Sequence, residues 1–238
     1  MLDVLIRNVM IIDGTGAKAY YGDIGIVGDR IVTGDRLVKE KAVHTIDARG
    51  LALSPGFIDI HSHHDLYIAD QDPVFRFQSF VMQGVTTCIV GNCGWSPAPC
   101  LPENKSMVLE LIRSMSVPMN GLYWNTMKEY FSYIESVGLM CNIAQLVGHG
   151  TIRISVMGDA NRFCTGEELE RMKSLLLNSL EAGCVGISSG LMYYPGMYAH
   201  TDELAELARI TGEYGRMYAT HLRGYCTTLP QSIAEAIE

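Results

Sequence analysis

The feature that most constrains the fold is an alternation, beginning near residue 55, of short apolar runs with longer segments of helical composition. The runs are almost continuously apolar, which is typical of strands buried on both faces of a parallel sheet. This alternation predicts βα units. Five strands are expected, at Gly56–His61, Thr86–Gly91, Cys141–Gly148, Val185–Ser188 and Met217–His221.

Two of the intervening segments carry clear helix signals. Thr165 and Glu168 form a capping-box pattern, and a stripe of Leu and Met at helical spacing leads to Gly183. A second helix is expected to begin at Thr201 and to end near Gly215. These signals support helices that cross between parallel strands.

The number of strands predicts an incomplete barrel. A closed (β/α)₈ barrel of the TIM type needs eight strands, and the helix that opens at Pro230 reaches Glu238 without a capping residue. We therefore expect residues 55–238 to be about five βα units of a TIM-type barrel truncated after the fifth strand. A natural five-stranded doubly wound domain is the alternative.

Residues 1–54 form a separate region without helical periodicity. Val4–Ile12 ends at the turn pair Asp13-Gly14, and Gly28-Asp29 marks a second hairpin. Val43–Ile46 and the apolar residues after Gly50 are expected to continue this meander. The region is predicted to be a small β module.

Composition excludes several classes of protein. The chain has 18 Lys and Arg against 26 Asp and Glu, a formal net charge of −8, which disfavours binding to nucleic acid or to an anionic membrane. It contains no apolar stretch long enough to span a bilayer and no signal-peptide pattern. Its seven cysteines include no CxxC pair. Reduced thiols and a cytoplasmic location are therefore expected.

Candidate metal ligands follow the predicted strands. His61 and His63 come at the end of the first barrel strand, and Cys93 lies in a glycine-flanked turn after the second. His221 ends the fifth strand, and His149 follows the third. Because these strand ends converge at the face where barrel enzymes keep their sites, imidazole and thiolate donors are expected to meet there. Surface histidines and a buried structural cysteine are the alternatives.

These motifs resemble a known family. The segment PGFIDIHSHHD after a β module resembles the amidohydrolase superfamily. More narrowly, GVTTCIVGNCG, LVGHGTIR, GISSGLMYYPG, HTDELAELAR and THLR resemble the N-acyl-D-amino-acid deacylases, or D-aminoacylases. The match covers nearly the whole chain in the family's order, so that the chain is similar to the N-terminal half of such an enzyme.

The resemblance implies a zinc-dependent hydrolase of N-acyl-D-amino acids with a (β/α)₈ barrel and a small β-sandwich built from both chain ends. His61, His63, Cys93 and His221 would be its metal ligands. They would hold one tight zinc ion, with room for a second, weaker one. The general acid/base, an Asp, would follow the eighth strand, beyond Glu238.

Residues for substrate binding are less sharply defined. Tyr193, which follows the fourth strand, is a candidate for the acyl or carboxylate group, with His149 and Arg223 as further candidates; loop packing is the alternative for Tyr193. The segment after Arg223 lacks the acidic pair that family members often have, which leaves the preferred substrate open. Asp59 and Asp65 are expected to orient the histidine ligands.

Two rival functions remain. A cyclic amidase of the hydantoinase or dihydroorotase type would bridge its metals with a modified Lys at the fourth strand end. The six lysines of this chain all lie away from predicted strand ends on the site face. The second rival is an inactive amidohydrolase fragment with open sheet edges.

Overall fold

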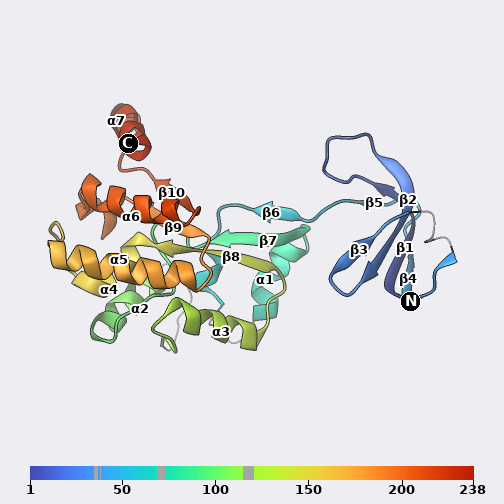
Figure 1. Cartoon of the computed structure of the whole chain (residues 1–238), viewed down its shortest axis with the longest axis horizontal. Helices are drawn as coiled ribbons and strands as arrows, with labels where there is room; N and C mark the ends of the chain where they lie inside the picture. Colours follow the sequence, from blue (N-terminus) through green and yellow to red (C-terminus); the bar gives the residue numbers. More distant parts are fainter. Residues whose placement is uncertain (35–36, 38, 69–72, 115–120) are drawn as a thin grey trace. The chain divides into compact units, whose positions relative to one another are not determined.

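The computed structural model describes residues 1–34, 37, 39–68, 73–114 and 121–238. The chain divides into two compact units, Met1–Gly56 and Phe57–Glu238. Each unit is built on one five-stranded sheet, labelled in Figure 1. None of the described helices combines the length and the apolar character needed to cross a membrane.

The first unit is organised around its longest strand. β1 (Leu2–Ile11) pairs antiparallel with β2 (Tyr20–Val27), which continues through a tight turn into β3 (Arg30–Val32). β4 (Ala42–Asp47) and β5 (Ala52–Leu53) both pair parallel with β1. The buried side chains of this unit include Leu5, Val9 and Ile11 of β1.

The predicted hairpin of β2 and β3 is confirmed, but the predicted continuation of the meander is wrong. Because β2 occupies one edge of β1, the later strands pair along the other edge, and they do so in the parallel direction. A β-sandwich, which would require a second sheet, stays a prediction for this unit.

The second unit contains the predicted parallel sheet. Its strand order is β10-β9-β8-β7-β6, and every neighbouring pair is parallel. The strands are β6 (Phe57–Asp59), β7 (Val85–Val90), β8 (Asn142–Gly148), β9 (Gly186–Gly190) and β10 (Met217–His221). The sheet is curled, so that it forms the half-barrel of five strands predicted from the sequence.

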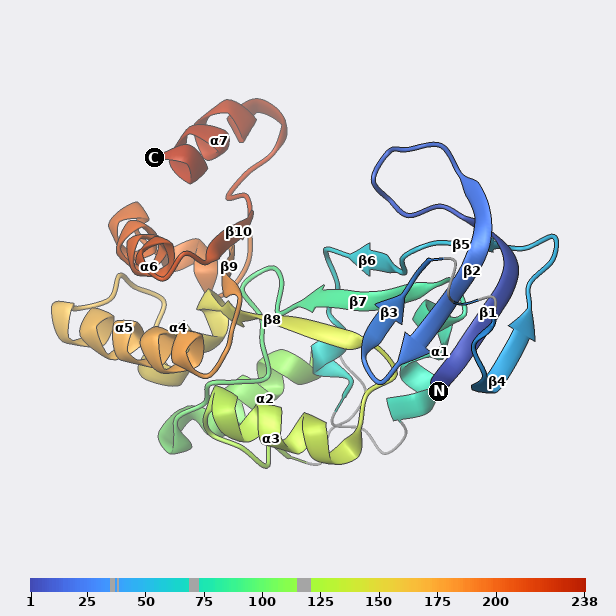
Figure 2. The same ribbon diagram turned by 45° about the vertical axis from the view of Figure 1, so that its right-hand side comes forward.

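Helices follow the strands along the chain, and α7, after the last strand, stands apart from the sheet (Figures 1 and 2). They are α1 (Pro73–Val81), α2 (Lys105–Arg113), α3 (Met127–Val137), α4 (His149–Met157), α5 (Gly166–Glu181), α6 (Thr201–Glu213) and α7 (Leu229–Ile237). One continuous core joins strands and helices, with Cys88, Trp124, Ile152, Leu176 and Leu207 among its buried members.

The capping box predicted for α5 is present. The Thr165 side chain accepts a hydrogen bond from the Glu168 backbone, and the Glu168 carboxylate accepts one from the Thr165 backbone. These bonds satisfy two N–H groups that the first turn of a helix leaves without partners. The helix begins where the sequence predicts and ends at Glu181, just before Gly183.

β6 is shorter than predicted. It ends at Asp59, so that His61 and His63 lie in the loop beyond the strand rather than on it. β6 stands at one edge of the sheet, and Phe57 and Ile58 are 65% and 61% exposed. β6 forms backbone bonds on one side only, and its ladder with β7 ends at Asp59.

Candidate metal centre

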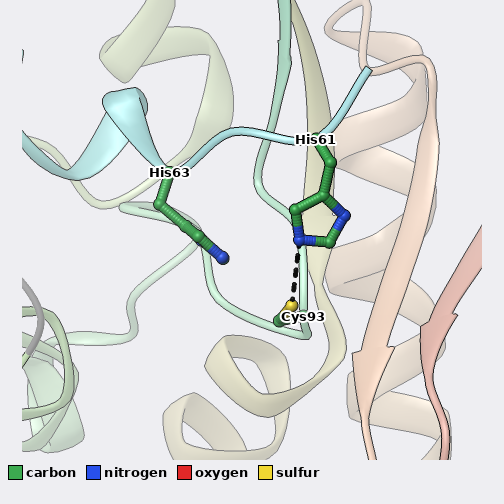
Figure 3. Close-up of side chains that lie close together, drawn as sticks. All are labelled: His61, His63 and Cys93. Carbon is green, nitrogen blue, oxygen red and sulfur yellow. Dashed lines mark hydrogen bonds between the residues drawn. The ribbon is translucent and has the colours of Figure 1, made fainter. Parts of the chain in front are cut away.

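Four of the predicted side chains meet above the ends of the strands. The Sγ atom of Cys93 lies 3.4 Å from Nε2 of His61 and 3.7 Å from Nδ1 of His221. One ligand atom each from His61, His63 and Cys93 lies within 4.8 Å of the others. Figure 3 shows the His61 ring and the Cys93 thiol directed toward each other. Cys93 therefore lies between histidines that come from opposite edges of the sheet.

The turn that carries Cys93 is a tight backbone structure. Cys93 has a φ of +56° and Gly94 a φ of +78°, so both lie in the left-handed region. A Cβ atom at Gly94 would lie 2.8 Å from the backbone nitrogen of Gly190, which only glycine avoids. The turn is thereby pressed against the end of β9, and the thiol is held at the level of the histidines.

A buried amide ties the two donor segments together. Asn92 is 2% exposed, and its Nδ2 donates to the carbonyls of Ser62 and Ile89 at 3.1 and 2.9 Å. Ser62 stands between His61 and His63, so this bond fixes the histidine loop against the cysteine turn. The one sequence signal for this role of Asn92 is its place beside Cys93.

The protonation of His63 suits a ligand. Burial, and beyond it the neighbouring imidazoles of His61 and His64, lower the pKa of His63. Its Nδ1 atom is buried without a hydrogen-bond partner among the described residues. The neutral imidazole is the form that binds metal. Two imidazoles beside a thiol, with a third imidazole within reach, match the nitrogen and sulfur donors that zinc prefers.

The two carboxylates near the histidine loop face other partners. Oδ1 of Asp59 accepts a bond from the backbone nitrogen of His61, not from its ring. Oδ2 of Asp65 accepts from the Gln145 amide at 2.9 Å, and burial raises the pKa of Asp65 to about 7. These contacts do not involve the rings of the ligand histidines, so the expectation that both carboxylates orient those ligands stays a prediction. Asp59 fixes the backbone of the loop.

His149, one of the predicted substrate residues, lies in the protein interior. It is 0% exposed, and its Nε2 is 2.7 Å from Oε1 of Glu203, whose other oxygen binds Arg153. Burial raises the pKa of Glu203 most, but the bonds from His149 and Arg153 together outweigh it and hold this pKa at about 2. Because it is enclosed, His149 has no surface for a substrate, and the geometry assigns it a structural role.

Arg223 is also engaged with the protein. Its guanidinium binds both carboxylate oxygens of Glu235 and the carbonyls of Met197 and Ala199. These bonds join the end of β10, the loop before α6 and helix α7. Glu235 of the same chain occupies the guanidinium of Arg223. A contact between Arg223 and substrate therefore stays a prediction.

Tyr193, the third predicted substrate residue, does reach the donor cluster. Its ring makes edge contacts with Trp95 and His221, with centroid distances of 5.2 and 5.1 Å. Its hydroxyl donates to the carbonyl of Cys93 at 2.9 Å. Tyr193 thus contacts two of the four donors.

The described lysine side chains of the second unit lie away from the donor cluster, as expected for a site built around a cysteine. Lys105 bonds to Asn125, and Lys173 of α5 pairs with Glu170 and Glu206. Within the part of the chain that the structure describes, no lysine lies on β6 to β10. The side chain that lies between the imidazoles of His61 and His221 is the thiol of Cys93 and not a lysine, which disfavours the cyclic amidase alternative.

Comparison with known proteins agrees with the geometry. No protein-family model matches the chain. It is 36% identical over 236 residues to the N-acyl-D-aspartate deacylase of Alcaligenes xylosoxydans xylosoxydans, a match of 99% of this chain and 46% of the relative. It is also 36% identical over 227 residues to the D-aminoacylase of that organism, covering 93% of this chain and 44% of the relative.

A solved structure shows the same likeness. The N-acyl-D-glutamate deacylase from Bordetella bronchiseptica, complexed with zinc and a phosphonate inhibitor that mimics the tetrahedral intermediate, superposes with a TM-score of 0.87 at 37% identity. The match covers 99% of this chain and 48% of that one. The chain thus spans about half the length of the curated relatives it matches. By sequence and by fold, 99% of the chain matches the N-terminal half of enzymes of the N-acyl-D-amino-acid deacylase (D-aminoacylase) family of amidohydrolases.

Proposed function

We propose that the protein is a zinc-dependent amidohydrolase that cleaves the amide bond of N-acyl-D-amino acids, with residues 1–238 supplying the metal-binding part. The observation that carries the proposal is the cluster in which His61 and His221 approach the Cys93 thiol to 3.4 and 3.7 Å, with His63 beside them. The relatives at 35–36% identity are named as deacylases of N-acyl-D-amino acids, and one related structure holds zinc.

The residues would divide the work as follows. His61 and His63 would hold one metal position, and Cys93 would bridge toward a tighter ion held with His221. A bound zinc ion lowers the pKa of its water to about 7 and polarises the scissile carbonyl. The thiol belongs to a turn tied to Ser188, because the Gly94 amide donates to the Ser188 hydroxyl at 2.9 Å. A second, weaker ion is part of the proposal.

The general base is proposed to lie outside residues 1–238. Hydrolysis needs a group within hydrogen-bond reach of the attacking water. The nearest described carboxylates, Asp59 and Asp65, are bound to the His61 backbone and to Gln145. The Asp that the family places after its eighth strand would fill this role. Its loss alone would lower the rate by roughly 10²–10⁴.

The proposal is tested first by metal binding. Zinc bound per chain would be measured after dialysis for the wild type, His61→Ala and the matched control His44→Ala, since His44 is an exposed histidine of β4 in the other unit. We expect the wild type and His44→Ala to retain zinc and His61→Ala to lose it. Equal zinc in all three proteins would contradict the site.

Activity tests the substrate. The longest polypeptide encoded by the gene would be assayed with zinc on N-acetyl-D-methionine and N-acetyl-L-methionine, and the 238-residue chain in parallel. We expect turnover selective for the D isomer in the former and no useful turnover in the latter. Equal turnover of both isomers would exclude the proposed specificity, and robust turnover by the 238-residue chain would place the base within it.

A further inference from the structure

The Cys93 turn needs support that its own sequence does not supply. The left-handed region is unfavourable for a residue other than glycine, and Cys93 lies there with a φ of +56°. The strain is relevant because the thiol position depends on this backbone. Two side chains from the β9 region hold the turn: the Ser188 hydroxyl accepts from the Gly94 amide, and the Tyr193 hydroxyl donates to the Cys93 carbonyl.

The geometry around Tyr193 is arranged for that bond. A Cβ atom at Gly190 would lie 2.2 Å from the Cys93 carbonyl oxygen and 2.5 Å from the Tyr193 hydroxyl. The phenol therefore reaches the carbonyl only because position 190 has no side chain. The ring is fixed between Trp95 and His221 by edge contacts at 5.2 and 5.1 Å. One side chain thus contacts the backbone of one donor and the ring of another.

We propose that Tyr193 is a positioning residue that holds the Cys93 thiol at the metal centre through its hydrogen bond to the Cys93 carbonyl. The inference rests on the proposed metal site and goes beyond it, because it assigns the phenol to the cysteine turn rather than to the substrate. The 2.9 Å bond already uses the phenolic proton. A substrate oxygen would have to compete with the Cys93 carbonyl for that proton.

The test removes one oxygen atom. Tyr193→Phe keeps the ring between its neighbours and deletes the bond to Cys93. Tyr194→Phe is the matched control, because the adjacent hydroxyl lies 3.4 Å from the Gly158 carbonyl, away from the cysteine turn. Zinc affinity of the 238-residue chain would be measured by competition with a chromophoric chelator. Loss of a group that orients a ligand typically weakens metal binding about 10–100-fold, which we expect for Tyr193→Phe and not for Tyr194→Phe.

Cobalt supplies a readout that reports the thiolate itself. Co²⁺ bound to a cysteine gives a thiolate-to-metal absorption band, which Cys93→Ala should abolish. We expect Tyr193→Phe to weaken or shift this band while its thermal unfolding stays close to that of Tyr194→Phe. A band and an affinity identical to those of Tyr194→Phe would overturn the positioning role.

A double-mutant cycle tests the route. If Tyr193 acts through Cys93, then Tyr193→Phe should cause no further loss of zinc affinity in a Cys93→Ala background. Additive losses would show that the tyrosine acts elsewhere and would refute the inference. A wild-type chain that binds zinc no better than Cys93→Ala would refute the proposed metal site itself. If instead the wild type binds zinc and Tyr193→Phe binds it with the same affinity, only the positioning role is refuted.

Discussion

Substitution of Glu203 by Gln should destabilise the half-barrel strongly. Glu203 is 2% exposed, and its two oxygens bind His149 and the guanidinium of Arg153, which is 1% exposed. The neutral amide keeps the shape of the side chain but removes the negative charge. Arg153 would then remain as a buried cation without a counter-charge, and an uncompensated buried charge strongly destabilises the folded state.

The magnitude follows from the burial of both partners. Breaking one side of a buried pair costs about 3–5 kcal/mol. Arg153 keeps bonds to the carbonyls of Arg162 and Tyr198, which offset part of the lost interaction and favour the lower end, about 3 kcal/mol. Because domains of this size are stable by about 5–15 kcal/mol, the loss would be easily measured.

The matched control lies on the same helix. Glu206 is a partly exposed residue of α6 that pairs with Lys173 and Arg209. Glu206→Gln should cost much less stability than Glu203→Gln, because ion pairs that solvent reaches contribute little to the free energy of unfolding.

Urea unfolding would compare the two variants with the wild type. Trp95 and Trp124 are the only tryptophans in the sequence, and both lie in the second unit, so their fluorescence reports its unfolding alone. Equal losses of stability in Glu203→Gln and Glu206→Gln, or a loss below about 1 kcal/mol in the former, would refute the reasoning from burial.

Four further outcomes are expected. The pKa of Glu203 is held at about 2, below its usual 4.5, so its stabilisation is complete above about pH 4.5 and is lost as the pH falls toward 2; wild type and Glu203→Gln should therefore converge in urea stability in acid. Thr165→Ala should destabilise the chain by about 1 kcal/mol through loss of the α5 cap, measured by the same unfolding assay. Cys93→Ala should bind zinc more weakly than Cys88→Ala, a change at a buried position of β7; equal metal content would argue against the ligand role. Arg223→Met should speed amide hydrogen exchange in α7, because Glu235 of that helix loses its bidentate partner, and unchanged exchange would show that the pair is dispensable.

The sheet of the second unit was predictable because its strands are nearly continuous apolar runs, the pattern expected of strands covered on both faces, although among β6 to β10 only β9 is buried at every residue. Runs such as Thr86–Gly91 and Met217–His221 need no alternation to be recognised, and the observed strands fall within a few residues of them. β6 was predicted too long, because Ile58 and Ile60 are apolar yet 61% and 72% exposed at the edge. At this edge strand, apolar residues are therefore not a sign of burial within the chain.

Helix α4 shows where periodicity fails. It begins at His149, directly after β8, and eight of its nine residues, through Val156, are buried. A helix enclosed on all sides carries no amphipathic stripe, so the pattern that identified α5 is absent from it. Arg153 of this helix is 1% exposed, and its partner Glu203 lies 50 residues away in sequence. A pairing over that separation in sequence depends on the tertiary fold, and no local sequence pattern predicts it.

The candidate site was more predictable than its surroundings because its residues follow strand ends. Parallel strands place those ends on one face, which accounts for the approach of His61 and Cys93 after neighbouring strands. The substrate candidates fared differently, since strand-end position alone does not say what a side chain binds. His149 and Arg223 both follow strands, yet each is engaged by a glutamate from a helix.

Curvature is the step that turns these positions into a possible metal centre. β6 and β10 are four strand spacings apart, which in a flat sheet would separate their ends by about 19 Å. His61 and His221 nevertheless each lie within 4 Å of the same sulfur atom. The sheet must therefore curl enough to bring its opposite edges toward Cys93, and a flat five-stranded doubly wound sheet would leave the histidines apart. The donor cluster is thus an independent indication of barrel curvature, obtained from side chains rather than from strand pairing.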